Sequence, residues 1–320
     1  MSKFTFVVPV YNSEDTIVDC IKALFDQRSV RYKIDYDVLV VDDGSSDSTL
    51  QLIKNFDVNI VSLGANFGRV EARRQGAIHA KTELLAFIDS RVIADSDLAF
   101  NIIKLGYKPA IAGNLNLTKS KYASFFDTVF FLIRRKYYGP EFIKTEPSDS
   151  YITRSNFLKS PKGTTMLVIS KNIFLKLIPD NYSKDTSDDT LLLHRLIFEY
   201  DRQILRSAKL GITYMNRKEL SKVVPWLFHR GKLFSDYYLK RTGIYRRQFG
   251  LFMISIILMI VLAVILPVAM WLFVILYLAV CAYLAENIRD FVVCLVMIPL
   301  IGVVFGSGVI CGFKFKTVSI

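Results

Sequence analysis

The hydropathy of the chain changes sharply at Phe249, and this change constrains the fold more than any other feature. Residues 249–313 are almost continuously apolar and contribute much of the 52% hydrophobic content. The residues up to Gln248 have the mixed composition of one soluble α/β domain of about 200–250 residues. We therefore predict a soluble domain at residues 1–220, a basic juxtamembrane segment at residues 221–248 and a transmembrane region at residues 249–313.

The apolar block is long enough for about three transmembrane helices. A helix crosses a bilayer with about 20 apolar residues, and Phe249–Ala285 is too long for one span. A turn at Pro267 would divide this stretch into two spans, and Phe291–Phe313 would form a third after the charged ENIRD segment. The alternative is one long, kinked helix followed by a single span.

Basic residues lie directly before the first predicted span. By the positive-inside rule they predict a multi-pass protein of the cell (inner) membrane with its N-terminal domain in the cytoplasm. These residues are Lys240, Arg241, Arg246 and Arg247.

The formal net charge is +12, and few of the charged residues follow Phe249, so the soluble domain is itself basic. Beside a membrane region, such a charge favours anionic lipid headgroups and phosphorylated substrates as partners over nucleic acid. The four cysteines form no CxxC pair and the three histidines have no metal-ligand spacing. Neither a disulfide framework nor a zinc site is indicated.

An earlier segment, KYASFFDTVFFLIRRKYYG, has an amphipathic helical pattern with basic residues at its end. Two interpretations fit it: a helix lying in the membrane interface, or a core helix packed on the sheet. Its apolar residues at helical spacing are Tyr122, Phe125, Phe126, Val129, Phe130, Ile133 and Tyr137.

Strand and helix patterns alternate in the N-terminal part of the chain. Strands are expected at Phe4–Pro9, Tyr36–Val41, Val58–Leu63 and Leu84–Ile88, and Ser13 is expected to cap the first helix. Such alternation predicts an α/β fold with a mostly parallel sheet. Ligands bind beyond the carboxyl ends of the strands in such sheets, so the polar residues that follow these strands should converge on one crevice.

Five segments resemble glycosyltransferase family 2, whose members have the GT-A nucleotide-sugar-binding fold. They are VVPVYNSEDTI, VDDGSSDST, NFGRVEARRQGA, FIDSRV and DTSDDTLLLHRL, in that order along the chain. The downstream YMNRKELSKVVPWLFHRGKLFSDYY and the predicted spans resemble the membrane-anchored exopolysaccharide glucosyltransferases of succinoglycan type. The resemblance implies a nucleotide-sugar donor.

The resemblance assigns donor-binding roles by position. Pro9 and Tyr11 would lie under the nucleotide, Asp42 and Asp43 would hold the base, and Arg73 would contact the nucleotide. Read without the family, the two aspartates are turn and helix-cap residues. Arg73 would likewise belong to a solvated helix face together with Arg69 and Arg74.

The chain departs from the family at its DxD motif, which reads Asp89-Ser90-Arg91. The second acid of that motif usually binds a divalent metal, Mg²⁺ or Mn²⁺, that bridges the diphosphate. A guanidinium cannot bind a cation, but it can neutralise phosphate charge directly. Asp89 would then bind a ribose hydroxyl or keep a weakened metal site, and Arg91 would contact the donor or pair with Asp89 or Asp95.

By the same resemblance, the catalytic base lies in SDDTLLLHRL. Asp189 matches the base of inverting enzymes, with Asp188 and Asp185 as alternatives. Acidic residues also favour a helix N-terminus for electrostatic reasons alone.

The QxxRW motif of processive synthases is not reproduced near the membrane region, which indicates single addition. In that region His229, Arg230 and Lys232 would contact the acceptor or its phosphate, or would form only a basic collar. We thus predict an inverting glycosyltransferase acting on a polyprenyl-diphosphate-linked saccharide. The alternatives are transfer to polyprenyl phosphate, and an inactive nucleotide-sugar-binding scaffold.

Overall fold

The computed structural model describes residues 3–27, 34–116, 125–139, 148–217, 219–265 and 267–314. These residues form two compact units, each described separately below. Unit 1 comprises residues 1–123 and 140–216, and unit 2 comprises residues 124–139 and 217–320.

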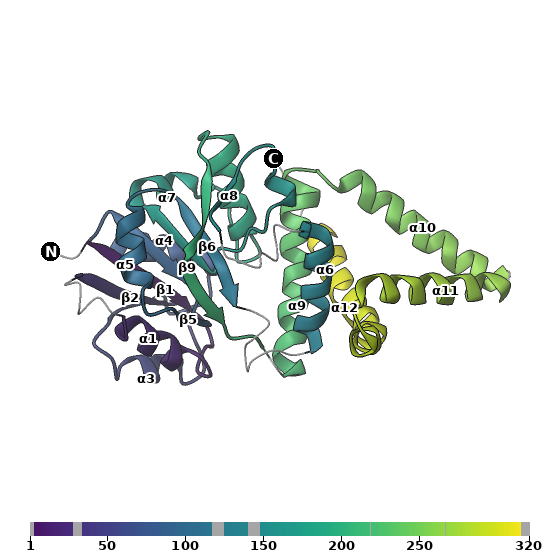
Figure 1. Cartoon of the computed structure of the whole chain (residues 1–320), viewed down its shortest axis with the longest axis horizontal. Coiled ribbons are helices and arrows are strands. Elements are labelled where there is room, and N and C mark those ends of the chain that lie inside the picture. Colours follow the sequence, from purple (N-terminus) through teal and green to yellow (C-terminus); the bar gives the residue numbers. More distant parts are fainter. Residues whose placement is uncertain are drawn as a thin grey trace. The chain divides into compact units, whose positions relative to one another are not determined.

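Unit 1 contains one mixed nine-stranded sheet and helices on both of its sides (Figure 1). Its strands are β1 (Phe4–Val10), β2 (Tyr36–Asp42), β3 (Asn59–Ser62), β4 (Leu84–Ile88), β5 (Val92–Ala94), β6 (Ala110–Asn116), β7 (Ser150–Ile152), β8 (Met166–Ser170) and β9 (Ile204–Tyr214). Its α-helices are α1 (Ile17–Phe25), α3 (Thr49–Ile53), α4 (Arg69–His79), α5 (Leu98–Leu105), α7 (Lys171–Leu177) and α8 (Asp188–Phe198), and a short 3₁₀ helix, η2, spans Phe157–Lys159.

The strand order is β3-β2-β1-β4-β8-β6-β9-β5, and β7 pairs with β9. The first four strands are parallel, as the sequence predicts, with Val7 opposite both Leu39 and Phe87. The later half is mixed: β8 is antiparallel to β4 and β6, whereas β6 and β9 are parallel. The expected α/β fold is confirmed, and the antiparallel pairings of its second half were not predicted.

The two faces of the sheet are buried by different helices. Alternate residues of β1, such as Phe6 and Val8, pack with α1, α3 and α5 in one apolar core. On the opposite face α4 approaches β1 closely at Gly76, where an added Cβ would lie 2.3 Å from Val7 Cγ1. This close packing holds α4 against the strands whose ends carry the predicted site.

The first helix begins later than predicted. Thr16 is its N-cap residue and α1 begins at Ile17, so the prediction that Ser13 caps it is wrong. The Ser13 hydroxyl instead lies 2.8 Å from that of Ser90, both buried, and the main-chain oxygen of Ser13 accepts the Ile17 N–H. Ser13 therefore joins the end of β1 to the segment after β4.

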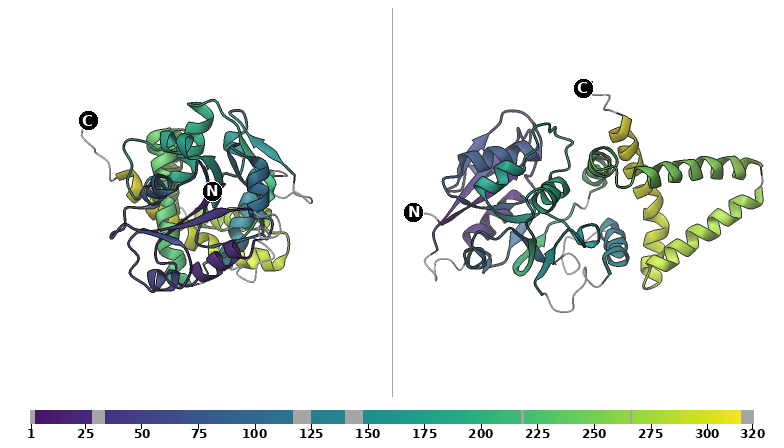
Figure 2. Two further views of the ribbon diagram at one scale, coloured as in Figure 1. Left: turned by 90° about the vertical axis from the view of Figure 1, so that its left-hand side faces the viewer. Right: turned by 90° about the horizontal axis from the view of Figure 1, so that it is seen from above.

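Unit 2 is helical (Figure 2). It contains α6 (Phe125–Tyr138), α9 (Leu220–Phe234), a π-helical turn η3 (Ser235–Arg241), α10 (Arg246–Ile265), α11 (Pro267–Leu284) and α12 (Ile288–Lys314). The described part of α10 ends at Ile265 and that of α11 begins at Pro267, and Leu266 between them lies outside the described residues, so the turn expected at Pro267 stays a prediction. By length and composition, one helix among the described residues, Ile288–Phe313, could cross a membrane, and Met270–Leu284 is a shorter apolar helix.

The amphipathic segment α6 belongs to unit 2 and is not a core helix of the sheet. Its buried residues are Phe126, Val129 and Leu132, which pack with residues of α9, α11 and α12. Phe125, Ile133 and Tyr137 of the predicted apolar stripe are exposed, and Tyr122 lies outside the described residues.

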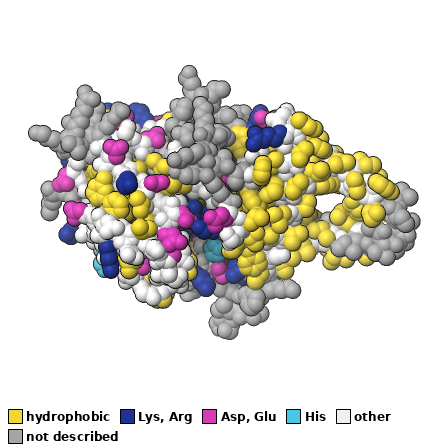
Figure 3. All heavy atoms as spheres, turned by 90° about the horizontal axis from the view of Figure 1, so that it is seen from below, with side chains coloured by type: hydrophobic (Ala, Val, Ile, Leu, Met, Phe, Trp, Pro, Cys, Tyr) yellow, Lys and Arg dark blue, Asp and Glu magenta, His cyan; other side chains and the backbone are white. Residues whose placement is uncertain are grey.

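Apolar side chains cover much of the surface of α10, α11 and α12, as Figure 3 shows for one face. Trp271 is 66% exposed and Leu272 64%, and charged side chains are scarce along these helices. So large an exposed apolar surface fits a lipid environment or another apolar partner better than water.

Candidate functional site

Three neighbouring parallel strands of unit 1 deliver polar residues to one edge of the sheet. Tyr11 follows β1, Asp42 and Asp43 lie at the end of β2, and Asp89 follows β4. Because β1 lies between β2 and β4, these residues lie side by side, as the sequence analysis expected.

The two aspartates after β2 make different hydrogen bonds. Asp42 accepts the Ser45 N–H at 3.1 Å and the Ser62 hydroxyl at 3.3 Å. Asp43 accepts the N–H groups of Phe67 and Gly68, each at 2.8 Å, one on each carboxylate oxygen. Burial raises the pKa of Asp43, and these two N–H groups oppose the increase.

Asp43 thereby fixes the loop that leads into α4. Gly68 has a φ of +93°, and an added Cβ there would lie 2.4 Å from Lys184 Cα. Glycine is required at this position for both reasons. The contact brings the loop before α4 next to the segment that leads into α8.

Arg73 is the centre of the site, and its side chain is fully buried. Its guanidinium donates to the Thr164 hydroxyl and carbonyl, both at 2.9 Å. It also lies 3.1 Å from Asp188, 3.5 Å from Asp89 and 3.5 Å from Asp189. A buried guanidinium needs such compensation, so the interpretation of Arg73 as a solvated residue does not hold.

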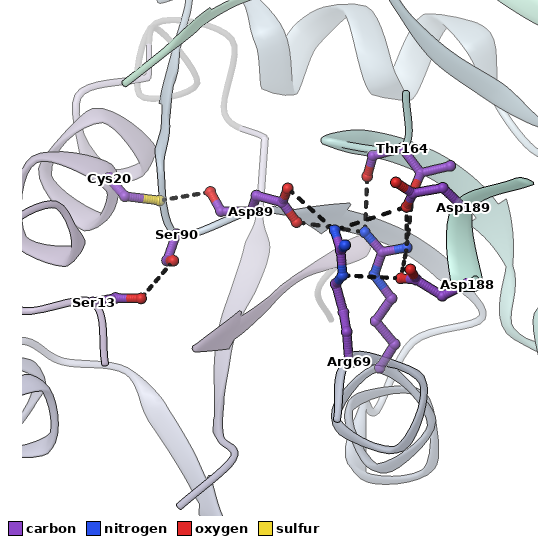
Figure 4. Close-up of polar contacts among 9 residues, drawn as sticks. Ser13, Cys20, Arg69, Asp89, Ser90, Thr164, Asp188 and Asp189 are labelled. Carbon is purple, nitrogen blue, oxygen red and sulfur yellow. Dashed lines mark hydrogen bonds and ion pairs between the residues drawn. The ribbon is translucent and has the colours of Figure 1, made fainter. Parts of the chain in front are cut away.

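Arg69 lies one turn before Arg73 on α4 and reaches the same three carboxylates (Figure 4). Its Nε lies 3.2 Å from Asp188, and its Nη1 lies 3.7 Å from Asp89 and 3.8 Å from Asp189. Burial lowers the pKa of Arg69, but the three carboxylates outweigh burial and raise it overall. Unlike Arg73, the Arg69 side chain is 33% exposed.

Asp188 and Asp189 begin α8 and have different surroundings. Asp188 is 3% exposed, and its Oδ2 forms ion pairs with both arginines, at 3.2 Å from Arg69 Nε and 3.1 Å from Arg73 Nη1. Asp189 is 16% exposed, and its Oδ1 accepts the Thr164 hydroxyl. Asp189 is thus the more accessible of the two and is oriented by Thr164.

Asp89 lies opposite these two acids, and Arg69 reaches between them (Figure 4). Burial raises its pKa, the carboxylates of Asp189 and Asp188 act in the same direction, and Arg69 and Arg73 oppose the increase. The Asp89 main-chain oxygen accepts the Cys20 thiol at 3.6 Å.

Arg91 is 9% exposed, and its Nη1 lies 3.5 Å from the Met215 carbonyl oxygen, a long hydrogen bond. Its main chain also accepts the Met215 N–H at 2.7 Å. The residues that lie closest to the Asp89 carboxylate in the ion pairs described above are Arg69 and Arg73. Residue 91, where the family has the second acid of its DxD motif, therefore lies next to Met215, directly after the end of β9.

A divalent metal does not fit this arrangement well. Both Asp89 oxygens already face guanidinium nitrogens at 3.5–3.7 Å, and Arg91 replaces the second acid. Within the described ranges, no group of three or more His, Cys, Asp or Glu residues is arranged to hold a metal ion.

The remaining predicted residues are placed as follows. Pro9 is buried within β1, and the Tyr11 side chain is 47% exposed beyond it. Asp185 lies in the loop before α8. His229, Arg230 and Lys232 lie on α9 of unit 2, so their proposed acceptor contacts stay predictions.

Sequence reasoning missed two members of the site, Arg69 and Thr164. Arg69 stands four residues before Arg73, which places both side chains on one face of a helix, and this spacing could have revealed it. Thr164 precedes β8, and no local pattern marks it.

An open groove of about 800 Å³ lies beside the site in unit 1. Its lining includes Phe67, Arg74, Tyr182 and Lys184. Glu71 accepts from Tyr182 and Arg74, which ties α4 to the segment before α8. None of the carboxylates of the cluster lines this groove.

Comparison with known proteins identifies the N-terminal part of the chain. Residues 5–105 match the sequence model of glycosyl transferase family 2. The match covers less than half of the chain and supports, for that region, the glycosyltransferase family 2 resemblance and the GT-A fold expected from its motifs.

Two curated relatives share part of this region. The poly(ribitol-phosphate) beta-glucosyltransferase of Bacillus spizizenii is 38% identical over 94 residues, 28% of this chain and 14% of that protein. The poly-beta-1,6-N-acetyl-D-glucosamine synthase of Staphylococcus epidermidis is 30% identical over 121 residues, 34% of this chain and 28% of that protein. The matches therefore span less than a third of either relative.

One solved structure is similar over nearly the whole chain. It is a mannosyltransferase from Pyrobaculum calidifontis in complex with GDP-Man and Mn²⁺. The TM-score is 0.55 at 14% identity, with 98% of this chain and 88% of that chain covered. At this identity the likeness shows a shared fold.

Proposed function

We propose that this protein is an inverting glycosyltransferase that transfers a sugar from a nucleotide-sugar donor to a hydroxyl group of a polyprenyl-diphosphate-linked saccharide. The observation that carries the proposal is the position of Asp189. Its carboxylate is 16% exposed, similar to that of Asp89 at 15%, and it lies at the start of α8 in a cluster with Arg69 and Arg73, next to the ends of the parallel strands. A family 2 domain with such a carboxylate has the base that inverting transfer needs.

In the proposed reaction the Asp189 carboxylate accepts the proton of the acceptor hydroxyl. The acceptor oxygen then forms a bond to the anomeric carbon as the bond from that carbon to the diphosphate oxygen breaks. The nucleoside diphosphate leaves from the opposite face of the sugar, which inverts the configuration. Thr164, which donates to Asp189 Oδ1, would hold the carboxylate in position.

The donor nucleotide would bind at the ends of β1 and β2. Pro9 and Tyr11 would support it, and Asp42 and Asp43 would define the pocket for the base. Because both Asp43 oxygens bind the loop before α4, Asp43 would shape this pocket indirectly, and Asp42 is the better candidate for a direct contact. Arg73, whose side chain is fully buried, would support the donor site from the interior of unit 1. Arg91 would add positive charge near the diphosphate.

The acceptor would approach from the cytoplasmic face of a membrane that unit 2 enters. Support comes from the apolar surfaces of α10, α11 and α12 and from the basic residues before α10. In this proposal residues 249–313 are the transmembrane region of a multi-pass protein of the cell membrane, and residues 1–220 are the catalytic domain. His229, Arg230 and Lys232 on α9 would meet the acceptor phosphates, and the basic flank would attract anionic lipids.

The test is a donor panel. The purified full-length protein is incubated with UDP- and GDP-sugars, with and without a polyprenyl-linked glycan extract, and nucleotide release is measured. Acceptor-stimulated release of one nucleotide, with the sugar recovered in the lipid fraction, supports the proposal. Transfer only to polyprenyl phosphate would show that the acceptor is the lipid phosphate and not a lipid-linked saccharide. Donor binding without nucleotide release would indicate an inactive nucleotide-sugar-binding scaffold.

A further inference from the structure

Arg69 differs from Arg73 in one respect that the proposed reaction does not use. Both residues lie on the same face of α4 and form ion pairs with Asp89, Asp188 and Asp189, and Figure 4 shows Arg69 among these carboxylates. Arg73 is fully buried, whereas the Arg69 side chain is 33% exposed. The Arg69 side chain is therefore the more accessible of the two to a ligand that enters the site.

The outer nitrogen of Arg69 has capacity for such a ligand. A guanidinium has five N–H donors. The ion pairs of Arg69 use Nε and Nη1, and among the described residues its Nη2 makes no ion pair. Guanidiniums bind phosphate oxygens in a bidentate manner.

The charge balance of the cluster indicates what kind of ligand Arg69 would face. The three carboxylates and two guanidiniums sum to one net negative charge, which would repel a diphosphate. A diphosphate therefore needs a direct contact with a positively charged group in order to bind here. The acid that would hold a metal in the family is Arg91 here, so the chain must supply its positive charge from side chains. Arg69 also begins α4, where the helix dipole favours anions.

We propose that Arg69 binds the diphosphate of the nucleotide-sugar donor and takes the place of a metal ion in neutralising it. This rests on the proposed function. As the diphosphate binds, Arg69 exchanges its longer contacts with Asp89 and Asp189, at 3.7 and 3.8 Å, for phosphate oxygens. Arg73 remains in place and compensates Asp188. Donor binding thus removes one cation from Asp189 before the acceptor arrives.

The experiment measures binding of UDP, GDP and inorganic pyrophosphate to the full-length protein by calorimetry in buffer containing EDTA. The variants are Arg69→Gln, which removes the charge, and Arg69→Lys, which keeps it without the planar donor set. Arg74→Gln is the matched control, because Arg74 lies on the same helix, is 40% exposed and pairs with Glu71 instead. Uridine and guanosine, which lack phosphates, are measured in parallel.

We expect Arg69→Gln to weaken binding of the preferred nucleoside diphosphate by about 10- to 100-fold, as for loss of a charge-assisted hydrogen bond. Binding of the nucleoside should be unchanged, Arg69→Lys should be intermediate, and Arg74→Gln should match the parent.

Several results would overturn the proposal. Diphosphate binding by Arg69→Gln equal to that of the parent would remove Arg69 from the site. Equal losses of diphosphate and nucleoside binding in both Arg69 variants would assign it a structural role. If the parent binds these ligands only when Mn²⁺ or Mg²⁺ is added, a metal ion and not Arg69 neutralises the diphosphate. In these three cases the proposed transferase would stand, whereas a parent that binds neither UDP, GDP nor pyrophosphate would remove both proposals.

Discussion

The guanidinium of Arg73 lies 3.1 Å from the carboxylate of Asp188, and the two side chains are 0% and 3% exposed. This pair joins α4 to α8. A buried ion pair adds little net stability when complete, but removal of one partner leaves an uncompensated charge in the interior. Asp188 is therefore best understood as a structural acid beside the candidate base.

Replacement of Asp188 by Ala should destabilise the fold of unit 1. We expect a loss of about 3–5 kcal/mol in unfolding free energy, because Arg73 would lose its closest counter-charge. Thermal unfolding of the full-length protein in detergent measures this. Asp201→Asn, which removes the charge of an exposed pair with Arg154 and keeps a residue suited to the positive φ of 50° there, is the control and should have little effect. A parent-like unfolding midpoint for Asp188→Ala would contradict the structural role.

Replacement of Asp189 by Asn should affect turnover and not donor binding. We expect kcat to fall by about 10²- to 10⁴-fold, the usual contribution of a general base, with UDP or GDP affinity within about twofold of the parent. Steady-state kinetics with the natural acceptor and calorimetry measure the two quantities. Undiminished turnover would show that another residue is the base, or that the acceptor is a phosphate that needs no base.

Activity should survive chelation of divalent metals. The charges next to Asp89 are guanidiniums, at 3.5 and 3.7 Å, and Arg91 replaces the second acid of the motif. We expect most activity to remain in EDTA, and Arg91→Asp to become dependent on added Mn²⁺ or Mg²⁺. Complete loss in EDTA with recovery on adding Mn²⁺ would show that the parent uses a metal.

The packing of α9 on α12 depends on two glycines. An added Cβ at Gly231 would lie 2.2 Å from the Phe305 carbonyl oxygen, and one at Gly308 would lie 2.0 Å from that of Phe228. We expect Gly231→Ala and Gly308→Ala each to lower the stability of unit 2 by about 1–3 kcal/mol through overpacking.

Two other glycines of α12 provide controls for that prediction. At Gly302 and Gly306 an added Cβ would meet no atom within 4 Å. Ala at these positions should therefore be tolerated in a thermal-shift assay in detergent. Equal effects at all four positions would show that the backbone contact does not determine stability.

Lys162 should give unit 1 a pH-dependent stability. Its ammonium donates to the carbonyl groups of Phe157 and Ser160, and burial lowers its pKa from 10.5 to about 8. Below pH 8 the folded and unfolded chains are both protonated at this residue, so the cost of burying the charge is fully present. Between pH 8 and 10.5 the unfolded chain binds more protons, so the unfolding free energy rises with pH.

Comparison with Lys162→Met isolates this effect. Relative to the variant, the parent should gain stability from pH 8 to pH 10, as chemical denaturation at each pH would show. A difference between the two proteins that does not change with pH would mean that Lys162 titrates normally in the folded state.

Much of unit 1 was predictable because its signals are local. The β4 strand has the predicted bounds, Leu84–Ile88, and β1 and β2 each extend one residue beyond prediction. The acidic residues that follow the parallel strands predicted a shared crevice, because neighbouring parallel strands end at the same edge of the sheet. The turn expected at Pro267 rests on the missing N–H and fixed φ of proline, and it stays a prediction.

What the sequence alone determined is therefore the α/β class, the polar residues at the ends of the parallel strands and the apolar C-terminal region. The tertiary structure alone decided which charges meet: Arg69 and Thr164 joined Asp89, Asp188 and Asp189, and α6 joined the C-terminal helices. Hydrophobic periodicity reports which face of an element is buried, but not which distant element covers it. The spacing of Arg69 and Arg73 places both on one face of α4, but which acids they meet depends on the long-range packing of α4 and α8.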